Sequence, residues 1–274
     1  MKNSLNSSIN IGRWLVIGVL FISTLLLFVI PNAEATIGIM GAIIVSVFAF
    51  WHGSERYGLK NMIILFLITW VISNFFESLS ILTGFPFGNY HYEMGGPKIV
   101  HVPLIIMPAC FAMGYVSYTL AHVLTGLFSQ KLKSVQLFIV PIIGAFIMVM
   151  WDLVMDPPAA TVNKQWIWED GGNYFGVPIS NYFGWFLVVY LFMQTFAIFL
   201  AKYDTNSKQT YDKSFWLEAA VIYGIQGLSF IIPAVVNDSH VEIYSSSALI
   251  CVFTMMFVAL LSSINIMSHK DRQL

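Results

Sequence analysis

The most regular feature of this sequence is a series of long apolar blocks, separated by short segments that carry charged or turn-forming residues. Crossing a bilayer requires a helix of about 20 apolar residues, and nearly all of the blocks approach or exceed that length. Their apolar residues surround the helix instead of forming one stripe, which is typical of lipid-exposed spans. The pattern predicts an all-α, polytopic transmembrane helical bundle of about eight spans, at approximately 14–30, 37–51, 60–82, 102–127, 135–155, 178–201, 215–236 and 244–267.

Composition supports a membrane protein. Hydrophobic residues make up 58% of the 274 residues and charged residues only 10%, and the mean hydropathy is +0.76. Soluble chains carry about 25% charged residues. A net charge of −1 provides no basic field for nucleic acid. The two cysteines, Cys110 and Cys251, lie inside apolar blocks and indicate no disulfide framework. We therefore expect residues 1–274 to form a single integral domain of the cell membrane.

The charges between the blocks predict the orientation of the bundle. Of the 13 basic residues, 11 fall before the first block, after an even-numbered block or at the chain end, whereas the alternate segments hold only Lys98 and Lys164. By the positive-inside rule both termini are cytoplasmic. The long segments 83–101 and 157–177 are then extracytoplasmic loops. Lys2, Arg13 and the small residues around Glu34 also resemble a signal peptide, so cleavage after the first block is an alternative.

The third block carries a polar stripe. Thr69, Ser73, Asn74, Glu77 and Ser80 recur at spacings of three and four, so they share one face of a helix. That face must point into the bundle. The hydroxyl and amide groups are equally explained as contacts between helices, but an ionisable residue inside a span indicates a functional site. Glu77 is therefore a candidate catalytic residue.

Two more acids stand at the end of the fifth block. Asp152 and Asp156 are four residues apart and share a helical face with Met148, and Pro157 is expected to end the helix just after them. Asp156 could equally serve to end the helix at the interface. Asp152 lies one turn deeper and is the stronger catalytic candidate.

The two long loops carry polar and aromatic residues on the same side of the membrane. Candidates for the site are His91, Tyr90, Tyr92, Trp166, Trp168 and Tyr174, although the aromatic residues could instead form an interfacial belt. A zinc site made of His91, His101, His240 and an aspartate is a further alternative. Similar Gly-Asn-Tyr segments occur at 88–90 and 172–174, which duplication or chance would explain equally.

Several membrane chemistries lack their sequence signatures. The six histidines are scattered and form none of the paired boxes of di-iron hydroxylases, and the last two spans lack the lysine that a retinal protein needs. Asp152 and Asp156 match half of a prenyltransferase motif, without an evident second acidic cluster. No phosphate-binding or dinucleotide motif is present.

Residues 70–190 resemble the membrane carotenoid-biosynthesis proteins of the carotenoid 1,2-hydratase (CruF) type. The resemblance rests on Glu77 with Thr83 to Tyr92 and Val102-Pro103, and on Asp152 to Pro157 with Trp166-Ile167-Trp168. It continues through Gly172, Tyr174, Gly176-Val177-Pro178, Asn181 and Gly184-Trp185.

The resemblance implies addition of water to the terminal isoprene double bond of lycopene, γ-carotene or a related polyene, without a cofactor. In this interpretation Asp152 or Glu77 protonates the alkene, because an apolar site favours a neutral carboxylic acid. A second carboxylate, such as Asp156, or His91 would orient the water. Aromatic faces would stabilise the carbocation. The substrate-binding residues expected are Tyr90, Tyr92, Trp151, Trp166, Trp168, Tyr174, Asn181 and Met148.

Two other functions compete with this hydro-lyase hypothesis. One is a carotenoid- or lipid-binding membrane protein without catalysis, and the other is a metal-dependent membrane hydrolase. We expect a carotenoid and the lipid bilayer as partners, no nucleic acid, no cofactor and no bound metal.

Overall fold

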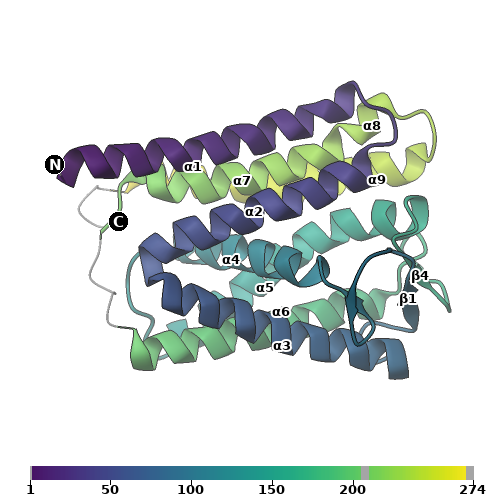
Figure 1. Cartoon of the computed structure of the whole chain (residues 1–274), viewed down its shortest axis with the longest axis horizontal. Coiled ribbons are helices and arrows are strands. Elements are labelled where there is room, and N and C mark those ends of the chain that lie inside the picture. Colours follow the sequence, from purple (N-terminus) through teal and green to yellow (C-terminus); the bar gives the residue numbers. More distant parts are fainter. Residues whose placement is uncertain (1, 205–209, 270–274) are drawn as a thin grey trace.

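The computed structural model describes residues 2–204 and 210–269. Within them, eight helical segments are long and apolar enough to cross a membrane, which confirms the predicted all-α bundle (Figure 1). Their helices are α1 (Lys2–Leu25), α2 (Glu34–Tyr57), α3 (Leu59–Thr83), α4 (Ile106–Leu124), α5 (Gln136–Asp156), α6 (Ile179–Tyr203), α7 (Lys213–Ile231), and α9 (Val241–Cys251) with α10 (Phe257–Ser268). Short 3₁₀- or π-helical turns cover Leu26–Phe28, Pro157–Val162 and Val252–Met256, and α8 covers Pro233–Val236.

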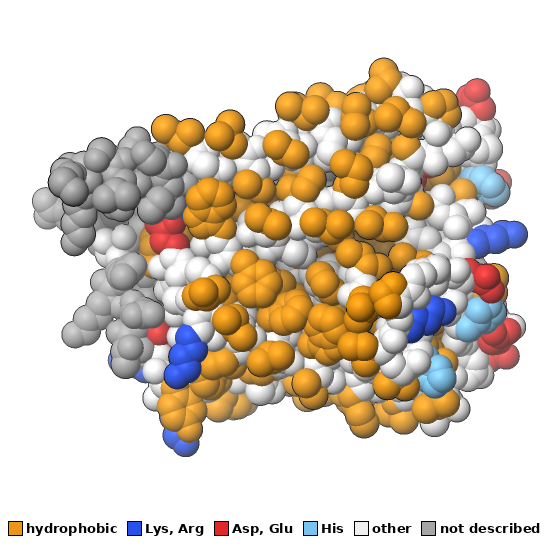
Figure 2. All heavy atoms as spheres, in the orientation of Figure 1, with side chains coloured by type: hydrophobic (Ala, Val, Ile, Leu, Met, Phe, Trp, Pro, Cys, Tyr) orange, Lys and Arg blue, Asp and Glu red, His pale blue; other side chains and the backbone are white. Residues whose placement is uncertain are grey.

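The surface of the bundle has the character expected of a chain in lipid. Large apolar side chains point outward along its length, among them Val71, Phe183 and Phe253. Figure 2 shows them as a broad apolar belt, with the charged side chains gathered at the two ends. Such a belt is stable when lipid replaces water as the solvent.

Helix α4 is the centre of the bundle. Every residue from Cys110 to Val123 is buried, and α4 contacts α2, α3, α5 and α7. A helix that is surrounded on all sides needs apolar residues on all sides. Helices α3, α5 and α6 pack on one side of α4, whereas α1, α7, α9 and α10 form the other layer of Figure 1.

The starts of α1 and α7 meet the end of α10 at one end of the bundle. The amide of Asn10 donates to Asp212 over 3.4 Å, and the Lys213 ammonium donates to the Met267 carbonyl over 3.1 Å. The long loops lie at the opposite end (Figure 1). Three basic residues used in the charge count, Lys208, Lys270 and Arg272, lie outside the described residues.

The second span is longer than the apolar block that predicts it. Block 37–51 is the middle of the 24-residue helix α2, whose first and last turns carry charged residues that the hydropathy pattern had excluded. Arg13 likewise does not flank the first span. It is completely buried inside the bundle. Its Nε lies 2.5 Å from an oxygen of Glu218 in α7, and its guanidinium also pairs with Glu55.

The α-helix of the fifth span ends at Asp156, immediately before Pro157, as predicted, but the chain stays helical beyond it. After α5 the chain continues helically as a π-turn over Pro157–Val162, closed by the 2.9 Å bond from the Asn163 N–H to the Pro158 carbonyl. A π-turn has a wider ring and bonds residues five apart. The two prolines therefore lie in its first positions, where the missing N–H groups are least needed.

Candidate functional site

A short two-stranded ribbon joins the two long loops. Strand β1 (Tyr90–Tyr92) pairs antiparallel with β4 (Trp166–Trp168), so that Tyr90 faces Trp168 and Tyr92 faces Trp166. A second pair, β2 (Lys98–Ile99) with β3 (Val102–Pro103), lies within the first loop. Alternate residues of a strand point to opposite faces. All four of these aromatic residues are therefore turned inward over the bundle.

The turn before β1 is fixed on the ends of α3 and α6. The Ser80 hydroxyl accepts from the Phe87 N–H over 3.0 Å and donates to the Gly88 carbonyl over 2.9 Å. Ser180 in α6 donates to the Phe87 carbonyl over 2.9 Å. Gly84 ends α3 with a φ of +79°, a left-handed conformation that favours glycine. These bonds place β1 directly above the polar face of α3.

Glu77 lies directly beneath the ribbon and is hydrogen-bonded to it. It is 2% exposed, and Thr69, Ser73 and Ser80 are buried on the same face of α3. The Tyr92 hydroxyl donates to Glu77 Oε2 over 2.8 Å, and the Tyr90 hydroxyl donates to the same oxygen. Two donors on one oxygen favour the ionised carboxylate. Burial, reinforced by the Glu77 carboxylate, raises the pKa of both tyrosines, so their hydroxyls remain donors.

Asp152 and Asp156 form a pair bridged by one amide. Both are buried on α5, and the Asn181 side-chain nitrogen donates to an oxygen of Asp156 and, over 3.4 Å, to an oxygen of Asp152. Asn181 itself is buried at the start of α6. Two carboxyl groups one turn apart in apolar surroundings repel each other when both are ionised. A single proton shared by the pair removes that repulsion.

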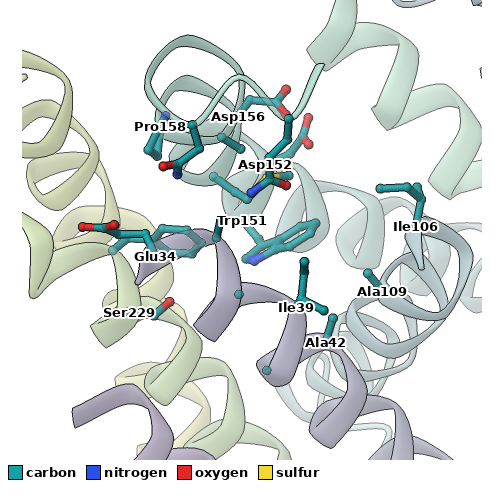
Figure 3. Close-up of a pocket in the computed structure, with 18 of the residues that line it drawn as sticks. Glu34, Ile39, Ala42, Ile106, Ala109, Trp151, Asp152, Asp156, Pro158 and Ser229 are labelled. Carbon is teal, nitrogen blue, oxygen red and sulfur yellow. The ribbon is translucent and has the colours of Figure 1, made fainter. Parts of the chain in front are cut away.

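One cavity contains all three acids. It holds about 1530 Å³ of space free of protein atoms, a volume that includes the part open to the outside. Glu77, Asp152, Asp156 and Asn181 line it, and most of its wall is apolar. Figure 3 shows Asp152 and Asp156 projecting from α5 into this space, with Trp151 beside them. The helical spacing alone had not placed these acids together.

The aromatic candidates mostly line the same cavity. Tyr90, Tyr92, Trp151, Trp166, Trp168 and Met148 are all in its wall. The indole N–H groups of Trp151 and Trp168 are buried and find no acceptor in the described part of the chain. These two tryptophans therefore line the cavity with aromatic side chains whose N–H groups have no partner among the described residues.

Two of the predicted site residues lie elsewhere. His91 is outside the cavity wall, and its side chain is 44% exposed between the carboxylates of Glu169 and Glu93. Hydrogen bonds to these carboxylates, Glu169 foremost, raise its pKa. Tyr174 is also absent from the wall. Its hydroxyl donates to the Leu153 carbonyl over 3.1 Å, and partial burial raises its pKa to about 12.

The zinc site considered above is not assembled. Among residues 2–204 and 210–269, no three His, Cys, Asp or Glu side chains are grouped so as to hold a metal ion. His91 turns toward its two glutamates, and His240 precedes α9 in another connection. The arrangement proposed from His91, His101 and His240 therefore has no geometric support.

Sequence reasoning missed several residues of the cavity wall that come from α2, α6, α7 and α9. Figure 3 shows two of them, Glu34 of α2 and Ser229 of α7, on the same side of the cavity. Pairs of polar residues three apart, Gln226 with Ser229 and Tyr244 with Ser247, could have indicated this part of the wall, as the polar stripe did in the third span. The additional lining residues include Glu34, Trp185, Gln226, Ser229, Tyr244 and Ser247.

Comparison with known proteins gives one match. A family model described as "Carotenoid biosynthesis protein" matches residues 33–257, which include every residue of the cavity named above. Comparisons with curated proteins and with solved structures gave no match.

Proposed function

The chain belongs to the carotenoid biosynthesis protein family, and from this premise we propose that it is a carotenoid 1,2-hydratase. It would add water across the terminal isoprene double bond of lycopene, γ-carotene or a related polyene. The observation that carries the proposal is the convergence of three buried carboxyl groups and several aromatic faces in one largely apolar cavity.

The reaction begins with a proton. A proton from the Asp152–Asp156 pair is transferred to the CH carbon of the terminal double bond, and the dimethyl carbon becomes a tertiary cation. An acid in this role must be neutral before it reacts. The shared proton of the pair meets that requirement, and Asn181 holds both carboxyl groups in place.

The cation requires negative charge and aromatic surface nearby. Glu77, ionised between two tyrosine hydroxyls, supplies the charge. Trp166 and Trp168 supply aromatic faces of the kind that stabilise cations. These groups are fixed before the charge develops, which is the arrangement that lowers a barrier.

Water completes the reaction. Its oxygen bonds to the dimethyl carbon, one of its protons passes to a carboxylate, and the product is a tertiary alcohol. The reaction needs no oxidant or reductant, and it returns the acid to its starting protonation state. The acids lie near the loop end of the bundle, where water is available, while the apolar part of the cavity suits the polyene.

The test is a pigment conversion. The chain is expressed in cells that accumulate lycopene or γ-carotene, and the extracted pigments are analysed by chromatography and mass spectrometry. We expect a product heavier by one water, whose hydroxyl oxygen comes from heavy-oxygen water in the medium. Pigment that co-purifies with the protein but is never altered would overturn the hydratase proposal and favour a carotenoid-binding protein.

A further inference from the structure

The cavity extends away from the acids to the lipid-facing surface. Between the first half of α2 and the start of α4 its wall consists of Gly38, Ile39 and Ala42 on one side and Ile106 and Ala109 on the other. Ile39 is 37% exposed within the apolar belt. Figure 2 shows a hollow in the belt at this place, between the positions of α2 and α4 in Figure 1.

Small residues keep this gap open. A Cβ atom built on Gly38 would meet no atom within 4 Å, and Ala42 and Ala109 offer only methyl groups. Figure 3 shows Ile39 and Ala42 of α2 and Ala109 of α4 on one side of the cavity, with Trp151 between them and the two aspartates. The gap therefore leads from the surface past Trp151 to the acids.

The gap ends where the two helices touch. The Ser46 hydroxyl lies 3.1 Å from the Pro108 carbonyl and 2.7 Å from the Ala42 carbonyl, and it can donate to either. One turn beyond Ala42, α2 and α4 are thus in direct contact. The opening is confined to the part of the belt nearest the acids.

An apolar groove continues from the gap along the outside of α2. It is formed by Ile43, Val47, Phe50 and Trp51 with Pro108, and Ile105 lines both this groove and the cavity. From Ile43 to Ser54 a helix advances about 16 Å. The groove and the cavity thus adjoin at Ile105, and the carboxyl groups lie in the cavity only.

We propose that the gap between α2 and α4 is the lateral entrance through which a long apolar isoprenoid chain passes from the bilayer to the acids. The groove along α2 holds the part of the chain that stays outside. The identity of this occupant as a carotene rests on the proposed function. The entrance admits the terminal group alone, so only the chain end is presented to Asp152.

The test narrows the entrance and follows both access and turnover. Ala42→Trp and Ala109→Trp fill the gap, and Val71→Trp, on the lipid-facing side of α3 away from the cavity, is the matched control. A hexadecyl diazirine in phosphatidylcholine vesicles serves as the access probe. After illumination, mass spectrometry measures the labelling of the segment that contains Trp151 and Met155. Pigment conversion is measured in parallel.

We expect labelling of this segment in the unsubstituted chain and in Val71→Trp. Both Ala42→Trp and Ala109→Trp should reduce it about tenfold, as expected when passage costs about 1.4 kcal/mol more. Equal labelling of all four proteins, or no labelling in the unsubstituted chain, would overturn the entrance. If Ala42→Trp is not recovered from the membrane, Ala42→Leu gives a smaller graded block.

The two readouts separate the entrance from the reaction. Full conversion of pigment by Ala42→Trp would overturn the entrance and leave the hydratase proposal standing. If Ala42→Trp loses labelling of the segment with Trp151 and Met155, and the unsubstituted chain converts no pigment, the entrance proposal is supported and the hydratase proposal is overturned.

Discussion

The hydroxyl of Tyr92 donates a 2.8 Å hydrogen bond to Oε2 of Glu77, and this bond connects the loop ribbon to the interior of the third span. Tyr90 donates to the same oxygen. The ribbon thus covers the cavity and also holds the Glu77 carboxyl group in position. Rigid placement of a charged group by donors that cannot move is the condition for electrostatic catalysis.

Loss of one of these donors should weaken both stability and turnover. Tyr92→Phe removes a hydrogen bond to a charged group, which is worth about 1.5–3 kcal/mol. We expect a lower unfolding temperature in detergent and less hydrated pigment. Tyr174→Phe is the matched control, because its hydroxyl bonds only to a backbone carbonyl. Equal turnover by the two variants would show that the bond to Glu77 has no catalytic part.

Asp152→Asn should abolish the hydrated product while the protein stays in the membrane. The amide cannot supply the proton, and loss of a general acid lowers rates about 10²–10⁴-fold. Quantitation of hydrated pigment per amount of membrane protein measures the effect. Normal turnover by this variant would remove Asp152 from the mechanism and leave Glu77 as the next acid to replace.

His91 provides a test of pH dependence. Its pKa in the folded protein is raised above the unfolded value of about 6.5 by Glu169 and Glu93. The pairing therefore adds stability that is fully present below about pH 6.5 and is lost as the pH rises through the folded pKa. Because the side chain is exposed, the effect on unfolding is small. NMR titration of the imidazole should show a lower pKa in Glu169→Gln, and an unchanged pKa would contradict the pairing.

The placement of His91 also bears on catalysis. It lies outside the cavity wall, so His91→Gln should convert pigment at close to the rate of the unsubstituted chain. A large loss of conversion would return His91 to the role that its sequence position suggested, that of orienting the attacking water.

The buried ion pair at the other end of the bundle should be costly to break. Arg13 and Glu218 are both fully buried, with 2.5 Å between Nε and Oε2. Glu218→Ala leaves the guanidinium with only Glu55 and the side-chain oxygen of Asn10 as hydrogen-bonding partners among the described residues, and it should destabilise the fold by about 3–5 kcal/mol. Replacing both partners with leucine should cost much less. Thermal unfolding in detergent measures the stability of the single and the double variant. Equal loss of stability in the two would show that the unpaired charge is not what destabilises Glu218→Ala.

Sidedness can be tested by labelling. The charge distribution predicts that the ribbon end is extracytoplasmic. Gly95→Cys, where an added Cβ meets open space, should react in intact cells with a maleimide that does not cross membranes. Lys133→Cys, exposed at the opposite end, should react only after lysis. Both native cysteines are buried. The reverse pattern would invert the topology.

The sequence by itself determined the bundle and its polar interior. Hydropathy and helical spacing are local properties, because lipid demands apolar residues on each span and a buried face recurs every three or four residues. They predicted the eight spans and predicted that Glu77 and Ser73 face the interior of the bundle. The same spacing put Asp152 and Asp156 on one face, and the structure buries both.

Only the tertiary structure decided which distant residues meet. The pairing of β1 with β4 turns Tyr90 and Tyr92 inward, and strand alternation then forces His91 outward. Contacts between α1 and α7 bury Arg13, which by sequence alone is an ordinary flanking charge. The gap beside Gly38 depends on how α2 and α4 cross. Such pairings follow from packing over the whole chain, and no local pattern encodes them.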